Sequence, residues 1–306
     1  MRARLGLARL VACLAAAVLL ATSCGGGRPA VEPLDPSVLR VASFDFPESR
    51  LLAELYGLRL RQAGFPVEVL TGLGTREVVA PALEQGLVDI VVDYTGSLLD
   101  RYGGTAEETH GTPEAVHRVA DRRLAARGLT VLRYAPAEDT NGFAVRTSFA
   151  REHLLSRISD LRPIAPGLTL GGPPECPQRR TCLLGLQDVY GLTFRAFRAQ
   201  PTRGTTATAL ETGEIDVGML ETTYGRLGDR RVTLLVDDLG LQPRENVVPV
   251  VRTEVVRRYG LRLTSALDEL SGRLDNSDLI RLNRLGAVDP RGPAAVAAAY
   301  LPRVRG

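Results

Sequence analysis

Two polar segments contain side chains that could bind a small polar molecule. Residues 93–97 read DYTGS and residues 220–224 read LETTY. Hydroxyl groups donate and accept hydrogen bonds and carboxylates accept them, so these segments suit a ligand with amine, hydroxyl or charged groups. Each segment follows an apolar run that we expect to be a strand, and open α/β sheets bind ligands beyond the carboxyl ends of their strands. The segments therefore predict one shared cleft, although ordinary strand-end turns would have the same composition.

The sequence lacks the residue patterns of common enzymes and metal sites. It contains no nucleophile elbow, no phosphate-binding loop and no HExxH motif, so we expect neither an enzyme nor a cofactor. His110, His117 and His153 are scattered without metal-ligand spacing, and we expect no metal. Cys176 and Cys182 lie close together in a chain with an export signal, so they are expected to form a disulfide.

An internal repeat relates two distant parts of the chain. Residues 82–90 and 209–217 share the pattern A-L-E-x-G-x-[VI]-D-[IV]. Each copy has the pattern of a helix end, a glycine cap and a buried strand. Two copies so far apart indicate two similar lobes rather than a solenoid. In the alignment of the two copies, Tyr94 matches Glu221.

The remaining chain alternates between short apolar runs and amphipathic stretches, which predicts parallel α/β sheets. Thr112 and Pro113 have the pattern of a helix start, and Gly128 that of its end. Gly260 and Gly286 are likewise expected to end helices. The expected strands are residues 39–44, 67–70, 88–92 and 129–132, and the other expected helices are residues 48–63, 75–85, 253–259, 277–285 and 293–301.

The N-terminus has the pattern of an export signal. Three arginines precede a short apolar run that is too short to span a bilayer. Residues 20–24 (LATSC) resemble a bacterial lipobox, so residues 1–24 are expected to be a lipoprotein signal whose Cys24 is lipidated. Residues 25–37 would form a flexible tether. The alternative is a plain signal peptide that is cut near Ala21.

The charge balance argues against a nucleic-acid partner. The chain has 38 basic and 35 acidic residues, and three of the basic residues belong to the signal. The mature chain is therefore close to neutral, which does not favour binding to nucleic acid.

Several motifs resemble those of one known family, the binding proteins of osmoprotectant ABC importers of the glycine betaine/choline, or quaternary-amine, class. The resemblance covers roughly residues 38–301. The matching segments are residues 89–97 (DIVVDYTGS, resembling D-x-x-x-E-Y-T-G-T), 136–145 (PAEDTNGFAV), 185–192 (GLQDVYGL, resembling G-L-x-x-x-Y-G-F), 222–225 (TTYG, where S-T-D-G is usual), 237–238 (DD) and 246–252 (NVVPVVR).

The resemblance implies an α/β fold of the type II periplasmic-binding-protein class, with two α/β lobes, two crossovers and a ligand cleft between them. One lobe would comprise residues 38–141 and 247–306, and the other residues 142–246. The implied function is extracytoplasmic capture of a small ligand and its delivery to the permease, with its ATPase, of an ABC importer. We expect a monomer anchored to the outer face of the cytoplasmic membrane. The alternative is a sensing or scaffolding lipoprotein of the same fold that no longer supports transport.

The resemblance also implies a set of ligand-binding residues. In this family a cage of tyrosine rings holds the ligand's trimethylammonium group by cation–π attraction, and this sequence clearly retains only Tyr94 of that cage. Arg179 falls near the family's carboxylate-binding arginine, with Arg180 as an equal candidate. The expected ligand-binding residues are Phe46, Tyr94, Thr95, Ser97, Asn141, Arg179, Glu221, Thr222, Tyr224, Glu245 and Asn246.

Two carboxylates change the expected ligand. Glu221 and Glu245 stand where aromatic residues are common in the family, and they would attract a cation or accept N–H and O–H donors. We therefore predict a small polar ligand that is cationic or zwitterionic, with glycine betaine and choline among the candidates. Alternatively, both carboxylates face solvent, and Phe44, Phe46 or Tyr224 rebuilds the aromatic cage.

Overall fold

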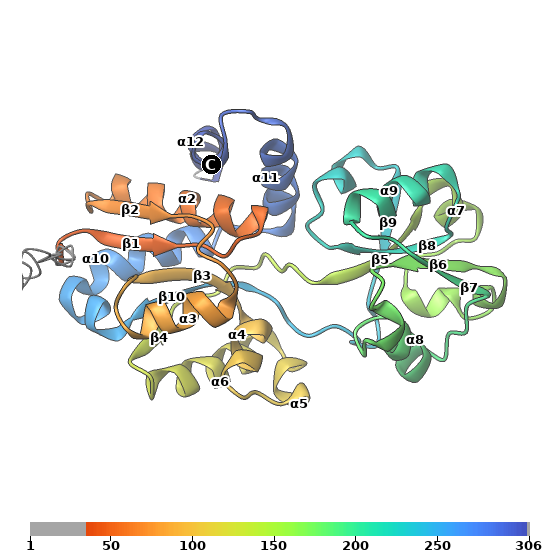
Figure 1. Ribbon diagram of the computed structural model, residues 1–306, viewed down its shortest axis with the longest axis horizontal. Coiled ribbons are helices and arrows are strands. Elements are labelled where there is room, and N and C mark those ends of the chain that lie inside the picture. The colour runs from red at the N-terminus through yellow and green to blue at the C-terminus, as the bar shows by residue number, and fades with distance from the viewer. Residues whose placement is uncertain (1–34, 305–306) are drawn as a thin grey trace, which may run out of the picture. The chain divides into compact units, whose positions relative to one another are not determined.

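The computed structural model describes residues 35–304, and for residues 302–304 it describes the backbone alone. The expected export signal, residues 1–24, and residues 25–34 of the expected tether lie outside the described residues. The described chain forms two five-stranded sheets flanked by helices (Figure 1), which confirms the α/β class. Within this part of the chain, none of the helices combines the length and the apolar character that a membrane span requires.

The first sheet takes strands from both ends of the described chain. Its strands are β1 (Leu39–Ala42), β2 (Val67–Leu70), β3 (Ile90–Tyr94), β4 (Leu129–Val131) and β10 (Val247–Arg252), in the order β2-β1-β3-β10-β4. β1 is parallel to β2 and β3, whereas β10 is antiparallel to β3 and β4. The expectation of parallel sheets is therefore wrong for β10. Parallel neighbours need a crossover connection that brings the chain back to the end of the sheet where the previous strand began. β10 has no such connection within the first sheet, because the chain enters it directly from the second sheet.

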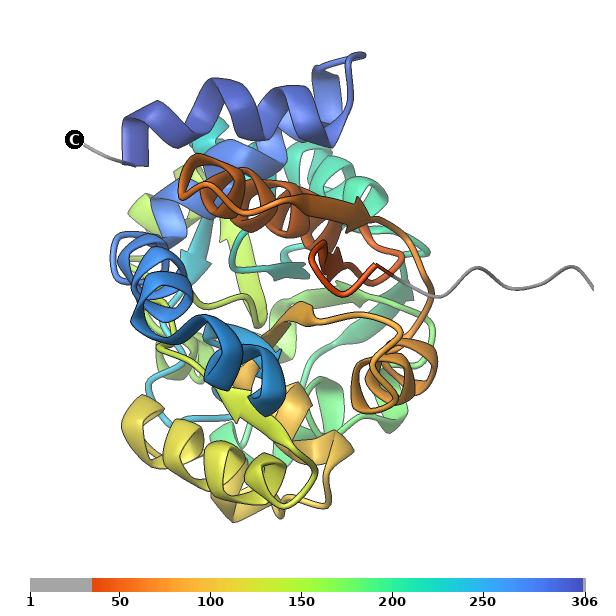
Figure 2. The same cartoon turned by 90° about the vertical axis from the view of Figure 1, so that its left-hand side faces the viewer.

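Helices cover both faces of the first sheet. The side chains of β3 alternate between the faces, so that Ile90 and Val92 join one hydrophobic cluster and Val91 joins another. Figure 2 shows the C-terminal helices beside α2. One cluster is covered by α2 (Pro47–Gln62), α10 (Thr253–Ser271), α11 (Asn276–Val288) and α12 (Pro293–Val304), and the other by α3 (Arg76–Glu84), α4 (Thr95–Arg101) and α6 (Pro113–Ala125), which follows the short helix α5 (Ala106–Thr109).

The second sheet repeats this plan. Its strands are β5 (Asn141–Arg146), β6 (Thr169–Gly172), β7 (Ala196–Ala199), β8 (Val217–Glu221) and β9 (Val232–Leu235), in the order β7-β6-β8-β5-β9. Its helices are α7 (Thr147–Glu152), α8 (Leu183–Tyr190) and α9 (Arg203–Thr212), with short 3₁₀ turns that include η3 (Cys176–Gln178) and η4 (Gly225–Asp229). β5 is antiparallel to β8 and β9, as β10 is to its neighbours. The expected disulfide between Cys176 and Cys182 is present.

The sequence repeat corresponds to the same elements in each sheet. Gly86 follows α3 with φ of 76° and Gly213 follows α9 with φ of 80°, a left-handed conformation that favours glycine. The next strands are β3 and β8, two strands that each occupy the centre of a sheet. Before them, Asp89 and Asp216 each accept a backbone N–H bond, from β1 at 3.0 Å and from β6 at 2.9 Å.

One of the two expected glycine helix ends is confirmed. Gly260 has a non-helical backbone (φ 55°, ψ −143°) that ends the first helical part of α10, and a second helical part follows to Ser271. Gly286 lies within α11, where an added Cβ atom would come 2.7 Å from the Leu51 side chain. Glycine at this position therefore permits close packing of α11 on α2 rather than a helix end.

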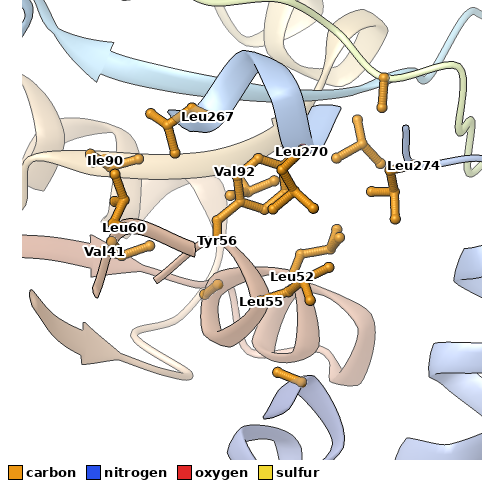
Figure 3. Packing of buried hydrophobic residues seen from close by; sticks show 14 of the residues in the cluster. Val41, Leu52, Leu55, Tyr56, Leu60, Ile90, Val92, Leu267, Leu270 and Leu274 are labelled. Atoms are coloured by element: carbon orange, nitrogen blue, oxygen red, sulfur yellow. The ribbon is translucent and has the colours of Figure 1, made fainter. Parts of the chain in front are cut away.

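The core beneath α2 generates a stability prediction. Leu52 is fully buried and lies with Leu55 and Tyr56 against the sheet and α10 (Figure 3). Leu52→Ala should lower the free energy of unfolding by about 2–5 kcal/mol, because it removes packed methyl groups and leaves a cavity. The matched control is Leu261→Ala, since Leu261 is 82% exposed, and its change should stay within about 0.5 kcal/mol. Urea denaturation measures both values, and equal losses would contradict this description of the core.

Candidate functional site

Two connecting segments, residues 132–140 and 236–246, join the sheets. Glu138 and Asn246 form an antiparallel bridge between them. The Thr95 hydroxyl accepts a bond from the Asn246 backbone N–H at 3.1 Å and donates to a backbone carbonyl at 3.2 Å. The Thr222 hydroxyl donates to the Glu138 carbonyl at 3.0 Å. The Asn246 side-chain amide donates to a backbone carbonyl at 3.1 Å, whereas its Oδ1 is buried without a hydrogen-bond partner in the described chain. The expected residues Thr95, Thr222 and Asn246 thus lie together, and backbone groups of the connecting segments bind the two hydroxyls.

A buried carboxylate that the sequence analysis missed lies at the centre of the site. Glu48 is 6% exposed at the start of α2. Its Oε1 accepts a bond from the Tyr94 hydroxyl at 2.6 Å, and its Oε2 accepts one from the Thr223 hydroxyl at 2.7 Å. The Asn283 side-chain amide also donates to Oε2 and to the Thr223 carbonyl. Glu48 therefore links the first sheet, the turn after β8 of the second sheet, and α11.

Three aromatic rings form a row that begins at Tyr94, the hydrogen-bond partner of this carboxylate. Phe44 stacks on Phe46 with centroids 5.9 Å apart, and Phe46 lies 6.0 Å from Tyr94. The Arg76 guanidinium lies 4.8 Å from the Phe44 centroid and makes two bonds, of 2.9 and 2.7 Å, to one oxygen of Asp93. The expected ligand-binding residues Tyr94 and Phe46 thus lie side by side, and the Arg76 guanidinium packs on the neighbouring ring of Phe44.

Glu245 accepts two hydrogen bonds from one residue. The Ser97 backbone N–H donates to it at 2.9 Å and the Ser97 hydroxyl at 2.7 Å. Burial of the carboxyl raises the pKa of Glu245 to about 7, although the bonds from Ser97 and the charge of Arg76 lower it. A hollow of about 310 Å³ opens beside these groups, lined by Phe44, Asp45, Phe46, Thr75, Arg76, Glu77, Ser97, Asp100 and Arg101.

Glu221 has a basic partner. Asn141 of β5 lies opposite Glu221 of β8 in the strand register. Arg203, in the first turn of α9, donates to the Glu221 carboxylate and to Asn141 Oδ1, the latter at 3.2 Å. The charge of Glu221 is therefore largely compensated within the protein, which the sequence analysis did not foresee.

Asp139 completes a group of four carboxyl groups. Its Oδ1 lies 2.8 Å from the Thr223 hydroxyl. Burial raises the pKa of Asp139 well above its usual range, and the charges of Glu48, Glu221 and Glu245 act in the same direction. Burial also raises the pKa of Glu48. The four carboxyl groups outnumber the two nearby arginines described above, so the region favours positive charge.

The side chains of two expected ligand-binding residues have partners outside this group. Arg179 is half-exposed and pairs with Glu175 at 2.8 Å on the disulfide loop. Tyr224 packs against a hydrophobic cluster of the second sheet that includes Leu220. Among the described residues, no side-chain hydrogen bond, ion pair or ring contact joins either one to Glu48 or Tyr94, although the Tyr224 backbone N–H donates to the Glu221 carbonyl at 3.1 Å.

One of the missed residues had a signal in the sequence. Glu48 lies on the same helical face as Leu52 and Leu55, and an acid on an apolar face requires a buried partner. Asp139, Thr223, Asn283 and Arg203 had no comparable local signal, because their partners come from distant segments.

The raised pKa of Glu245 generates a pH prediction. A carboxyl whose pKa is higher in the folded chain stabilises the fold at low pH, and this contribution is lost as pH rises through about 7. Glu245→Gln should therefore flatten the decline in unfolding free energy between about pH 4.5 and pH 7, the interval between the ordinary and the raised pKa of this carboxyl. Chemical denaturation at several pH values measures the slopes. A variant whose slope matches the parent's would show that Glu245 titrates normally.

Comparisons with known proteins identify relatives of this chain. The "Glycine-betaine-binding protein" of Pseudomonas aeruginosa is 32% identical over 274 residues, which are 86% of each chain. The "Carnitine transport binding protein OpuCC" of Listeria monocytogenes is 25% identical over 292 residues, 93% of this chain and 92% of the relative. A crystal structure described as a glycine betaine/carnitine/choline ABC transporter has the same fold, with a TM-score of 0.80, 22% identity, and coverage of 87% of this chain and 98% of the other.

The family itself is shown by a match over most of the chain. Residues 37–303 match the family described as "Substrate binding domain of ABC-type glycine betaine transport system". Its members are extracytoplasmic proteins that bind small molecules and deliver them to a permease, and it is not an enzyme family. The chain therefore belongs to the family of substrate-binding domains of ABC-type glycine betaine transport systems, as its motifs predict.

Proposed function

We propose that this chain binds a small osmoprotectant of the glycine betaine class, cationic or zwitterionic, and passes it to the permease and ATPase of an ABC importer. The observation that carries the proposal is the convergence of Phe46 and Tyr94 with the carboxyl groups of Glu48, Asp139 and Glu245. Aromatic faces attract a weakly hydrated quaternary ammonium, and the surplus of carboxyl groups adds charge attraction.

The other end of a zwitterionic ligand needs hydrogen-bond donors. We keep Arg179, with Arg180 as its alternative, as the proposed partner of a ligand carboxylate. Support comes from the Gln242 side-chain amide, which donates to the Thr181 carbonyl at 2.9 Å and holds the disulfide loop beside the second connecting segment. In this proposal the loop moves its arginines toward the ligand, and the ligand would compete with Glu175 for Arg179.

Ligand capture would use movement between two lobes. We propose residues 38–141 with 247–306 as one lobe and residues 142–246 as the other, with the connecting segments as the hinge. Each lobe would contain one of the two sheets. Closure on a ligand is a shift between open and closed forms, and it requires better ligand contacts in the closed form. The chain would act as a monomer.

The aromatic part of this proposal predicts a ranking of ligands and variants. Glycine betaine should raise the melting temperature of residues 28–306, whereas 3,3-dimethylbutanoate, its uncharged-carbon counterpart, should not, because only the former carries the cation. Tyr94→Leu should weaken binding by about 2 kcal/mol, roughly 30-fold, through loss of the ring. Tyr94→Phe keeps the ring and should weaken binding less than Tyr94→Leu does. Calorimetric titration measures the affinities. Equal binding of both compounds would contradict cation recognition, and binding of neither would contradict the ligand class.

The lipid anchor is a separate proposal that rests on the motif before Cys24. We predict that the full chain incorporates a labelled fatty acid in a bacterial host and sediments with membranes. Cys24→Ser should abolish the label and release the protein, because no thiol remains for the acyl group. Cys13→Ser is the matched control and should keep the label. A labelled Cys24→Ser protein would contradict the lipoprotein assignment.

A further inference from the structure

The Thr223 hydroxyl lies between two carboxyl groups. It is 1% exposed, 2.7 Å from Glu48 Oε2 and 2.8 Å from Asp139 Oδ1. A hydroxyl has a single hydrogen, so it donates to one of these oxygens only. If both carboxyls were ionised, the other contact would bring two oxygen lone pairs together without a proton between them. Both contacts become hydrogen bonds when one of the two carboxyl groups carries a proton.

The distribution of donors shows which carboxyl is neutral. Glu48 also accepts bonds from the Tyr94 hydroxyl and the Asn283 amide, and these bonds favour its ionised form against the effect of burial, which raises its pKa. Thr223 is the one side-chain partner that the structure gives to the Asp139 carboxyl. The proton therefore belongs on Asp139, where fewer donors favour the ionised form.

We propose that Asp139 is a neutral acid that donates to Thr223 Oγ1, which in turn donates to Glu48 Oε2, and that assembly of this relay takes up one proton from solvent. The proton moves onto Asp139 Oδ1 and no other bond changes. Burial and the charge of Glu48, which raise the pKa of Asp139, support the same assignment.

The surroundings of Asp139 oppose a second negative charge. From α2 it faces Glu48, from β8 Glu221 with its partner Arg203, and from the second connecting segment Glu245. The nearby Arg76 is already paired with Asp93, and Arg244 lies 3.6 Å from Glu138. The hydroxyl of Tyr94, from β3, also faces Asp139, and it donates to Glu48.

The relay joins segments that belong to different sheets. Glu48 lies in α2 beside the first sheet, Asp139 in the first connecting segment, and Thr223 in the turn that follows β8. Separation of these segments would expose both carboxyls to water and release the proton. This inference rests on the proposed function to the extent that ligand binding brings the segments together. A neutral Asp139 also leaves fewer fixed negative charges, which favours a ligand headgroup with one positive charge over a polyamine.

Calorimetric titration of glycine betaine at about pH 6, in two buffers of different ionisation enthalpy, tests the relay. The parent should take up close to one proton per ligand bound. Asp139→Asn should bind with almost no uptake, because its amide N–H is a permanent donor to Thr223. The matched control is Glu107→Gln, an exposed carboxyl that should behave as the parent. With rising pH the parent's affinity should fall by up to about tenfold per pH unit, and that of Asp139→Asn should fall less.

The outcomes separate this inference from the proposed function. No proton uptake by the parent, or equal uptake by Asp139→Asn, overturns the relay. Uptake that survives Asp139→Asn but disappears in Glu245→Gln assigns the proton to Glu245 and also overturns it. If glycine betaine does not bind, the proposed function fails, and ligand-free denaturation tests the relay instead. The parent should then lose stability more steeply than Asp139→Asn as pH rises from about 5 to 7, because a raised folded pKa stabilises at low pH. Equal slopes overturn the relay.

Discussion

The Glu48 carboxylate is the interaction on which the rest of the site depends. Burial of a carboxylate is costly unless donors replace the lost water, and each oxygen of Glu48 has at least one donor. Those donors come from β3, from the turn after β8 and from α11, which are far apart in the sequence. Their positions relative to one another are therefore coupled through one charge. The same bond restrains the Tyr94 side chain, because it fixes the position of the hydroxyl at the end of the ring.

The two sheets share a construction that does not extend to the site. Asp89 and Asp216 occupy equivalent places, and each has an arginine nearby: Arg252 at 3.3 Å and Arg146 at 4.0 Å. These pairs lie before β3 and β8, at the opposite ends from the site. At the site ends the two copies diverge, because β3 ends in an aromatic ring whereas β8 ends in a carboxylate. An aromatic face and a carboxylate both attract a cation, by different interactions.

The sequence predicted those features of the fold that depend on local interactions. The α2 and α6 helices follow from apolar periodicity and from a helix start at Pro113, and the Thr112 side chain accepts a bond from the Ala115 N–H as an N-cap. The direction of β10 could not be predicted in this way, because it depends on which sheet the chain leaves. Part of the candidate site follows from local pattern: Tyr94 and Glu221 end β3 and β8, where the pattern changes from apolar to polar, and Ser97 follows in α4. Glu48 and Asn283, which are 235 residues apart, meet only in the folded chain.

The carboxyl groups of the site lower the stability of the fold but help to attract a cation. Carboxyl groups held close together and away from water repel one another, and an apolar or amide side chain at some of these places would stabilise the fold more. Arg203 offsets one of the charges and the Thr223 contacts indicate that a proton offsets another, so the repulsion is reduced without removal of the acids. What remains is a region of modest negative charge beside two rings, with Tyr94 held firmly by Glu48. Such a region attracts a single quaternary cation without the large desolvation penalty of several uncompensated carboxylates.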